Sequence, residues 1–166
     1  MGNRFLLPEN KPYTDRFGVA TFNGSGWGTI LDFARHAQPD IHVICAQEHR
    51  KLAPDIVQCS ASVAKVGWKS VWASAVETAK STFAGVVLLV RKHLATWNFE
   101  EAAQICKGRV AWCVVRLKSL GNIAIYSAYF KVGVGLDDYN IGLVKAIGLH
   151  TKGHGLPYIV AGDFNC

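Results

Sequence analysis

The N-terminal half of the chain alternates short apolar runs with segments of helical spacing. Residues 18–22 and 41–46 are apolar runs with the length and β-branched content of buried strands. Between them, residues 27–34 place apolar side chains at i, i+3, i+4 and i+7, which predicts an amphipathic helix that ends before Pro39. A second helix with one apolar face is predicted at residues 54–66. The pattern therefore predicts a strand–helix–strand–helix order.

The middle of the chain is richer in strands. The pattern predicts them in five segments: residues 69–74, 82–91, 96–99, 110–117 and 123–128. Residues 86–90 are apolar on both faces, which is typical of a central strand. The last two strands are separated by a short turn, so we expect them to pair antiparallel. A helix at residues 137–150 and a strand that leads from residue 157 to Asp163 complete the pattern.

The order of these elements indicates the fold class. Helices alternate with strands at both ends of the chain, and this arrangement predicts an α/β fold, a layered sandwich with mixed sheets. A chain of 166 residues is long enough for one domain with its own core. Residues 1–15 are polar and contain two prolines, so we expect a flexible N-terminal arm at 1–15 and the domain at 16–166.

Polar side chains follow four of the predicted strands. Asn23 follows the first strand, Glu48 the second and Tyr129 a later one, while Asp163 and Asn165 end the last. Ligands of open α/β sheets bind at the carboxyl ends of strands, so we expect these side chains to meet. In an extended strand Asp163 and Asn165 would point the same way, into one pocket.

Two interpretations of these residues stay open. Each of them, taken alone, fits a solvated loop residue after a strand. Taken together, they fit a site in which Glu48 binds Mg²⁺, because a carboxylate there is costly unless solvated, paired or metal-bound. Asp163 could act as a base on a water molecule or orient it. Asn23, Tyr129 and Asn165 could hold phosphate oxygens, and the repetition at four strand ends favours this second interpretation.

The composition is that of a globular chain with a basic surface. Hydrophobic residues make up 50% of the chain and charged residues 18%, which argues against intrinsic disorder. The net charge of +6 favours polyanionic partners such as nucleic acid, but without a dense Lys/Arg block a merely basic surface explains it equally well. No segment approaches the ~20 apolar residues of a membrane span.

The cysteines bear on the compartment. There are five of them, an odd number, and no pair has Cys-x-x-Cys spacing, so neither a disulfide framework nor a structural zinc site is expected. Reduced thiols indicate an intracellular protein, and residues 1–12 lack the apolar core of a signal peptide. The sequence sets no oligomeric state.

The order of the polar motifs resembles the endonuclease/exonuclease/phosphatase superfamily, which has the deoxyribonuclease I-like fold. The matching motifs are Thr-Phe-Asn at the first strand, Gln-Glu after the second, the later tyrosine, and Gly-Asp-Phe-Asn at the last. The resemblance covers about residues 17–166. It implies an incomplete half of a four-layer α/β sandwich, and hydrolysis of phosphate esters with Mg²⁺ or Mn²⁺.

The resemblance also implies a role for each matching residue. Glu48 matches the metal-binding glutamate, and Asn23 and Tyr129 match the residues near the metal and the phosphate. Asp163 matches the aspartate that positions or activates the attacking water. Asn165 matches the asparagine beside the scissile phosphate.

The chain departs from the superfamily pattern in two places. Tyr129 is followed by Phe-Lys-Val-Gly, where a proline is usual, and no Ser-Asp-His element follows Asp163. That element supplies the histidine that completes the hydrolytic site, so we expect a truncated domain that lacks most of its second sheet and is inactive alone. Three hypotheses remain: a metal-dependent nuclease or phosphodiesterase, a non-catalytic module that binds nucleic acid or protein, and a degenerate gene fragment.

Overall fold

The computed structural model describes residues 16–79, 81–97 and 104–165. The first part of the chain forms β1 (Gly18–Asn23), α1 (Trp27–His36), β2 (Ile41–Gln47) and α2 (Ala53–Lys65). This is the predicted strand–helix–strand–helix order. α1 ends before Pro39, and Pro54 lies in the first turn of α2, where its missing N–H costs no hydrogen bond.

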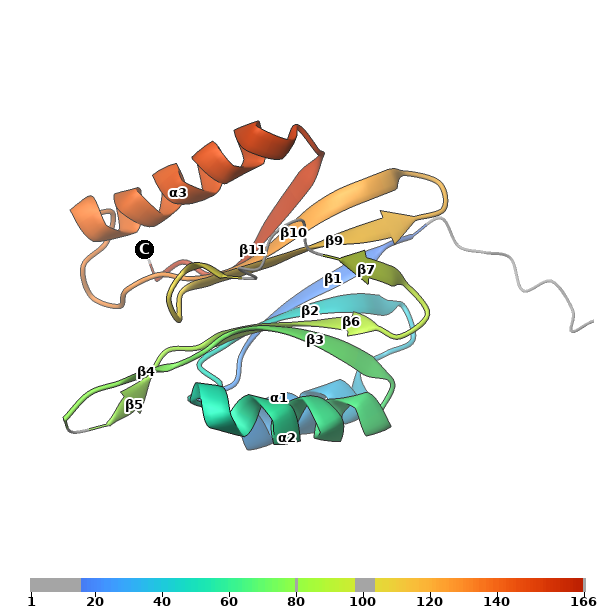
Figure 1. The fold of residues 1–166 in the computed structure, drawn as a ribbon, viewed down its shortest axis with the longest axis horizontal. Helices are drawn as coiled ribbons and strands as arrows, with labels where there is room; N and C mark the ends of the chain where they lie inside the picture. The colour runs from blue at the N-terminus through green and yellow to red at the C-terminus, as the bar shows by residue number, and fades with distance from the viewer. Residues whose placement is uncertain (1–15, 80, 98–103, 166) are drawn as a thin grey trace, which may run out of the picture.

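One sheet has the strand order β1-β2-β6-β3, with β3 at Trp68–Ala73 and β6 at Val86–Arg91. β1 runs parallel to β2, whereas β6 runs antiparallel to both β2 and β3. Residues 86–90 are fully buried, as predicted for a strand that is apolar on both faces. α1 and α2 cover the outer face of this sheet (Figure 1), and Ile30 and Val63 pack there against the strands.

A second sheet has the order β11-β10-β9-β7, and β8 also pairs with β9. Its strands are β7 (Ala95–Trp97), β8 (Gln104–Cys106), β9 (Val110–Leu117), β10 (Gly121–Tyr129) and β11 (Tyr158–Asp163). β9 and β10 form the predicted antiparallel pair. β11 is parallel to β10 and is reached through α3 (Asp138–His154), because a parallel connection needs a crossover. α3 covers the outer face of this sheet (Figure 1).

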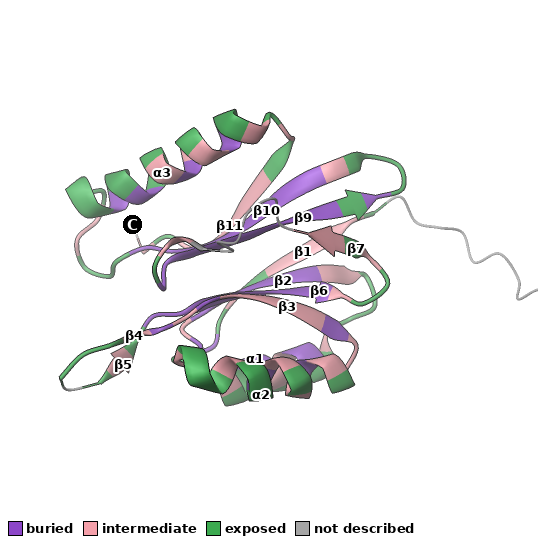
Figure 2. Ribbon diagram, viewed as in Figure 1, coloured by how far each residue is buried: buried purple, intermediate pink, exposed green. Residues whose placement is uncertain are grey.

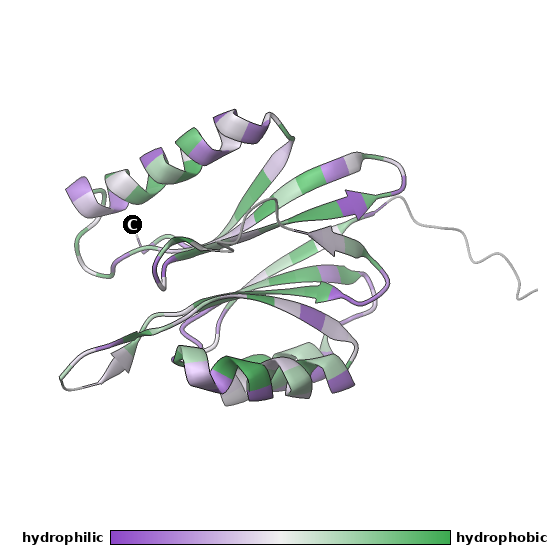
Figure 3. Cartoon of the chain, viewed as in Figure 1, coloured by the Kyte–Doolittle hydropathy of each residue, from purple (hydrophilic) through white to green (hydrophobic). Residues whose placement is uncertain are grey.

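The two sheets face each other across a shared core. One cluster of buried side chains combines Val43 and Leu88 of the first sheet with Val115 and Ile125 of the second. Burial is concentrated in the strands (Figure 2), and much of their length is hydrophobic (Figure 3). The helix–sheet–sheet–helix order in Figure 1 agrees with the α/β layered sandwich and its mixed sheets.

The expectation that the second sheet would be mostly absent is wrong. Five strands build it, and four of them precede α3. β9 and β10 are buried on both faces, so they need cover on each side. The first sheet covers one face and α3 the other, which makes a separate sheet more favourable than an extension of the first.

The predicted strand at residues 82–91 is interrupted. Ala84 and Gly85 have φ angles of 59° and 89°, which a strand cannot include, so the segment splits into β5 (Thr82–Phe83) and β6. β5 pairs with β4 (Val76–Glu77) in a two-stranded hairpin that the pattern did not predict. This hairpin extends from the body of the sandwich (Figure 1).

α3 is longer than the pattern predicts. Asp137 caps its N-terminus, because the Asp137 side chain accepts a hydrogen bond from the Asn140 N–H. The helix continues past residue 150 to His154 and ends at Gly155, whose φ of 64° suits a glycine cap.

One prediction falls wholly, and another partly, outside the described residues. The expected arm at residues 1–15 lies outside them, and so does the end of the strand predicted at residues 96–99. The start of the domain at residue 16 therefore stays a prediction. In the part of the chain that the structure describes, no helix is both long and apolar enough to cross a membrane.

Candidate active site

Four strands end at one side of the sandwich and bring four polar side chains together. Asn23, Tyr129 and Asp163 are the last residues of β1, β10 and β11, and Glu48 directly follows β2. β1 is parallel to β2, and β10 is parallel to β11, so the two strands of each pair end at the same edge of their sheet. Between the sheets, the edge strands β1 and β11 run next to each other. The structure thus brings together four of the five predicted site residues.

Asn23 bridges the two carboxylates of this cluster. Its Oδ1 atom accepts a hydrogen bond from the Ser25 N–H at 3.1 Å, which assigns the orientation of the amide. Its Nδ2 group therefore donates one hydrogen to Glu48 Oε1 at 3.0 Å and the other to Asp163 Oδ2 at 2.9 Å. One amide group thus holds two carboxylates at a fixed spacing.

Glu48 is held in its ionised form. Its Oε1 atom also accepts a hydrogen bond from the Tyr129 hydroxyl at 2.5 Å, and Oε2 accepts one from Arg50 Nη2 at 3.0 Å. Burial alone would raise the pKa of Glu48, but its hydrogen-bond donors and the charge of Arg50 lower it below its ordinary value. Burial and the Glu48 carboxylate raise the pKa of Tyr129 to about 12, so the phenol stays neutral.

Asn165, the fifth predicted residue, makes its side-chain hydrogen bond outside the cluster. β11 ends at Asp163, and Asn165 has a φ of 43°, so the alternation of an extended strand no longer applies. Its Nδ2 group donates to the Phe130 carbonyl at 3.1 Å, and its backbone N–H donates to Asp163 Oδ1 at 3.2 Å. The expectation that both side chains point into one pocket is therefore not met: Asn165 contacts Asp163 through its backbone.

Strained backbone gathers around the cluster. Among the described residues, every non-glycine residue with a positive φ lies in, or hydrogen-bonds to, a loop that carries the cluster: Ser25, Glu48, Arg50, Ala84 and Asn165. Such conformations cost on the order of 1–3 kcal/mol each and persist mainly at functional sites, where surrounding contacts hold them. Here the Arg50 N–H donates to the Ala84 carbonyl at 3.2 Å, which joins two strained segments.

His49 anchors the loop that carries Glu48. Its Nδ1 atom accepts from the Lys51 N–H at 2.9 Å, so the ring proton is on Nε2, which donates to the Ala73 carbonyl at 3.1 Å. The ring is fully buried against Gly85, where a Cβ would lie 2.5 Å from a ring carbon. This role could not be predicted from the sequence, because a histidine between two charged residues looks exposed until the packing is known.

The neutral state of His49 predicts an acid-sensitive fold. Burial lowers the pKa of His49 from 6.5 to about 4 in the folded chain. At pH values between about 4 and 6.5, His49 binds a proton in the unfolded chain but not in the folded chain. The free energy of unfolding must therefore fall as the pH is lowered. We expect the free energy of unfolding to drop by up to about 3 kcal/mol between pH 7 and pH 4.

Urea unfolding at a series of pH values measures this effect. His49→Gln should show a flatter dependence on pH, because it removes the titrating ring. His36→Gln is the matched control, since the His36 side chain is 76% exposed and its removal should leave the slope unchanged. Equal slopes for the unchanged chain and His49→Gln would refute the assignment.

Arg109 positions Tyr129, a second role that the sequence pattern did not predict. Its guanidinium lies 4.7 Å from the centre of the Tyr129 ring, and its Nη1 atom donates to the carbonyls of Tyr129 and Phe130 at 3.4 and 3.3 Å. Only 8% of Arg109 is exposed. An arginine just before a strand carries no signal of such a role, because its carbonyl partners lie at and just after the end of a different strand, β10.

The oxygen atoms of the cluster suit a hydrated divalent cation. Glu48 and Asp163 supply carboxylate oxygens, and Mg²⁺ commonly binds through one or two carboxylates, with water and substrate oxygens completing its shell. Within the described ranges, no group of three or more His, Cys, Asp or Glu side chains is placed to hold a metal ion. The chain thus offers a partial donor set that fits Mg²⁺ or Mn²⁺, and no closed structural site.

Comparison with known structures identifies the fold of the chain. No protein-family model and no curated protein sequence matches the chain. Solved structures do match. ANGEL2, described as a 2′,3′-cyclic phosphatase, superposes with a TM-score of 0.64 at 12% identity, over 90% of this chain and 52% of that one. The endonuclease domain of TRAS1, a telomere-specific non-LTR retrotransposon, gives a TM-score of 0.60 at 15% identity, over 89% and 60%.

A third structure is the 3′-5′ exonuclease NExo from Neisseria meningitidis, with a TM-score of 0.58 at 19% identity, over 89% of this chain and 57% of that one. This chain therefore spans between about half and three fifths of the length of these structures. At such identities the likeness establishes the fold. The chain has the fold of the endonuclease/exonuclease/phosphatase superfamily, as the ordered motifs at its strand ends predicted.

Proposed function

We propose that residues 16–166 belong to a divalent-metal-dependent phosphoester hydrolase, and specifically a nuclease. The observation that carries this proposal is the pair of carboxylates, Glu48 and Asp163, that Asn23 bridges at the carboxyl ends of β1, β2 and β11. The fold supports it, because structures that share this fold are described as a phosphatase, an exonuclease and an endonuclease.

Each side chain of the cluster has a chemical role in this proposal. Glu48 is the metal ligand, and the bound Mg²⁺ or Mn²⁺ would neutralise charge on the phosphate. Asp163 accepts a proton from the attacking water or orients it, as a positioned carboxylate can. Tyr129 stays neutral; its one hydroxyl proton now goes to Glu48 Oε1, and it would turn from Glu48 to a phosphate oxygen when substrate binds. Asn23 holds the two carboxylates apart, and Asn165 supports Asp163.

Nucleic acid is the substrate class that we favour. The net charge of +6 attracts a polyanion. One of the matching structures is the 3′ phosphatase NExo bound to a product DNA hairpin, at a TM-score of 0.54 and 17% identity. Phosphoinositides are the competing class of phosphoester, and the experiments below distinguish the two.

We further propose that residues 1–166 alone turn over slowly. Asp163 accepts hydrogen bonds from Asn23 and from the Asn165 backbone. No described histidine forms a hydrogen bond with Asp163. His49, the histidine next to Glu48 in sequence, has both ring nitrogens engaged elsewhere. Among the described residues, Asp163 therefore has no histidine partner that would assist it in proton transfer.

Mn²⁺ binding to the 166-residue chain, followed by electron paramagnetic resonance, tests the proposal without requiring turnover. We expect Glu48→Gln to weaken Mn²⁺ binding by at least about 10-fold, as changes at metal sites commonly do. Glu77→Gln, on the exposed hairpin, is the control and should bind Mn²⁺ normally. Equal Mn²⁺ affinities in all three proteins would refute a metal site at Glu48, and rapid metal-dependent cleavage by the unchanged chain would refute slow turnover.

A second candidate function is metal-independent binding of nucleic acid. The observation that favours it is that the Glu48 carboxylate already has three hydrogen-bond donors, one of them the cationic Arg50. Such a carboxylate is neutralised without a metal. Salt-sensitive binding of an oligonucleotide with neither Mn²⁺ affinity nor cleavage would favour this alternative.

A further inference from the structure

A cleft opens beside Glu48, between the β4–β5 hairpin and the loop after β10. Its volume is about 520 Å³, which lies in the range of ligand-binding sites. Three of the four charged residues that line it are cationic: Arg50, Arg109 and Lys131. The candidate active site forms one wall of this cleft, because Glu48 and Tyr129 also line it.

Lys131 stands at the rim of the cleft on a fixed backbone. Its N–H donates to Asn140 Oδ1 at 2.8 Å, and Asn140 Nδ2 donates back to the Lys131 carbonyl at 3.1 Å. Asn140 is fully buried, so this pair of hydrogen bonds locks the loop to the start of α3. The Lys131 ammonium lies 5.8 Å from the Tyr139 ring and forms no salt bridge within the described ranges. It can therefore pair with an anion in the cleft.

Arg50 and Arg109 differ in what they can offer a ligand. The Arg50 side chain is 51% exposed, and only its Nη2 atom is engaged with Glu48, so further N–H groups remain for an anion. Arg109 is almost fully buried beneath Tyr129 and Phe83. It adds positive charge to the floor of the cleft without being a direct contact.

Phe83 gives the cleft an aromatic surface. It is 37% exposed on β5, and the guanidinium of Arg109 lies 5.7 Å from its ring. An exposed ring beside cationic groups matches the way single-stranded nucleic acids are bound, with phosphates on the cations and bases stacked on aromatic side chains. A base can stack on such a ring only when it has left its own helical stack, as in a single strand.

We propose that this cleft binds the single-stranded nucleotides next to the scissile phosphate, with phosphates against Arg50 and Lys131 and a base on Phe83. The proposal rests on the proposed function, since it places the strand beside Glu48 and Asp163. It assigns specificity to the hairpin and to the loop after β10, which lie outside the carboxylate cluster.

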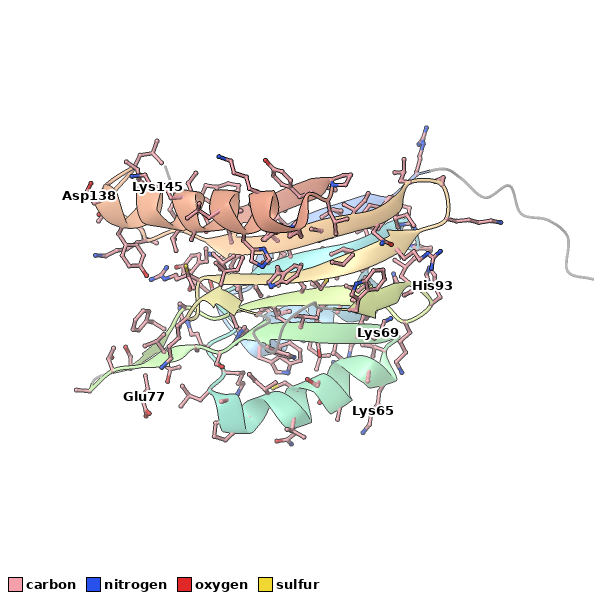
Figure 4. The ribbon with its side chains drawn as sticks, turned by 45° about the horizontal axis from the view of Figure 1, so that its top comes forward. Lys65, Lys69, Glu77, His93, Asp138 and Lys145 are labelled. Carbon is pink, nitrogen blue, oxygen red and sulfur yellow. The ribbon has the colours of Figure 1, made fainter. Side chains whose placement is uncertain are left out.

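Fluorescence anisotropy of a labelled single-stranded oligonucleotide with the 166-residue chain, in the presence of EDTA, tests the cleft separately from catalysis. Lys131→Ala should weaken binding and lower the slope of log K against log [salt] by about 0.7, the effect of one lost phosphate contact on a single strand. Lys145→Ala is the matched control. Lys145 lies on α3, in a different layer from the hairpin (Figure 4), and its removal should leave that slope unchanged.

Phe83 is tested with two substitutions. Phe83→Leu should weaken binding by about 5- to 150-fold, because stacking is worth about 1–3 kcal/mol per base. Phe83→Trp should bind the oligonucleotide as tightly as the unchanged chain does, because it retains an aromatic ring. Circular dichroism of each variant checks that the hairpin change leaves the fold intact. Equal binding by Phe83→Leu and the unchanged chain would overturn the stacking role.

The remaining outcomes separate the competing explanations. Tighter binding of a duplex of the same length, or of vesicles that contain phosphoinositides, would overturn the single-strand assignment. If Mn²⁺ binding is absent but the Lys131 and Phe83 variants behave as expected, the cleft stands and the hydrolase proposal fails. If Mn²⁺ binds at Glu48 but these variants bind the oligonucleotide normally, the hydrolase proposal stands and the cleft assignment is overturned.

Discussion

Gly162→Ala should lower the free energy of unfolding by about 3 kcal/mol, the upper part of the range for overpacking. Gly162 pairs with Ala128 in the parallel ladder between β10 and β11. A Cβ at Gly162 would overlap the Ala128 carbonyl oxygen and lie 2.8 Å from its carbonyl carbon. These are backbone atoms of a fully buried residue in an interior strand, so they cannot rotate away as a side chain would. The clash must then be relieved by separating β11 from β10.

The loss of stability is measured by urea unfolding followed by circular dichroism. Gly142→Ala is the matched control, because it makes the same change at an exposed position of α3, where no heavy atom outside the local helix backbone lies within 4 Å of the new Cβ. Alanine favours a helix over glycine, so this control should gain about 1 kcal/mol. If both substitutions shift stability in the same direction, the close approach of β10 and β11 at Gly162 is refuted.

The same substitution should also affect the site, since Asp163 follows Gly162 directly. A displaced β11 would move Asp163 away from Asn23, whose amide nitrogen now lies 2.9 Å from its Oδ2 atom. A stable Gly162→Ala chain should therefore bind Mn²⁺ more weakly than the unchanged chain. Glycine here allows two backbones to approach where the carboxylate must be delivered.

Asp163→Asn and Glu48→Gln should each reduce metal-dependent phosphodiester cleavage by at least about 100-fold, the scale on which a positioned acid or base contributes. The cleavage rate should be measured for a gene product that contains residues 16–166 and cleaves nucleic acid. In the proposed mechanism, Asp163→Asn removes the group that accepts a proton from water or orients it. Glu48→Gln would remove the charge that attracts the cation. Both substitutions conserve shape, so a loss of activity reports on chemistry.

The control for both substitutions is Glu77→Gln. Glu77 is an exposed acid of the hairpin whose side chain points away from the sandwich (Figure 4), and its removal changes the net charge in the same way as Glu48→Gln. Cleavage by Glu77→Gln should match that of the unchanged protein. Full activity in both Asp163→Asn and Glu48→Gln would exclude the carboxylate pair as the reaction centre.

The local elements of this fold could be predicted because each depends on neighbours in sequence. The apolar spacing of residues 27–34 produces α1, and the doubly apolar run at 86–90 produces the interior strand β6. The break at Ala84 and Gly85 was missed for the opposite reason. Nothing in the local pattern requires a positive φ there, and the loop around His49 imposes it from another part of the chain.

The membership of the candidate site was predicted in part. Asn23, Glu48, Tyr129 and Asp163 meet because strand order and direction bring their strand ends together. Asn165 was assigned to the same pocket from strand alternation, but β11 ends before it and the alternation stops. His49, Arg109 and the cleft formed with Phe83 were not predicted, since their roles arise from burial and from contacts with distant carbonyls.

The sequence by itself determined the elements, the α/β class and the polar residues that end the strands, because these follow from side-chain periodicity and local backbone preference. Only the tertiary structure decided that the chain builds two sheets, that Asn23 joins Glu48 to Asp163, and that a cationic cleft lies beside them. The physical reason is the separation along the sequence over which each effect acts. Hydrophobic patterning acts over a few residues, whereas the pairing of β1 with β2, of β10 with β11, and the packing of the two sheets join residues up to 140 positions apart.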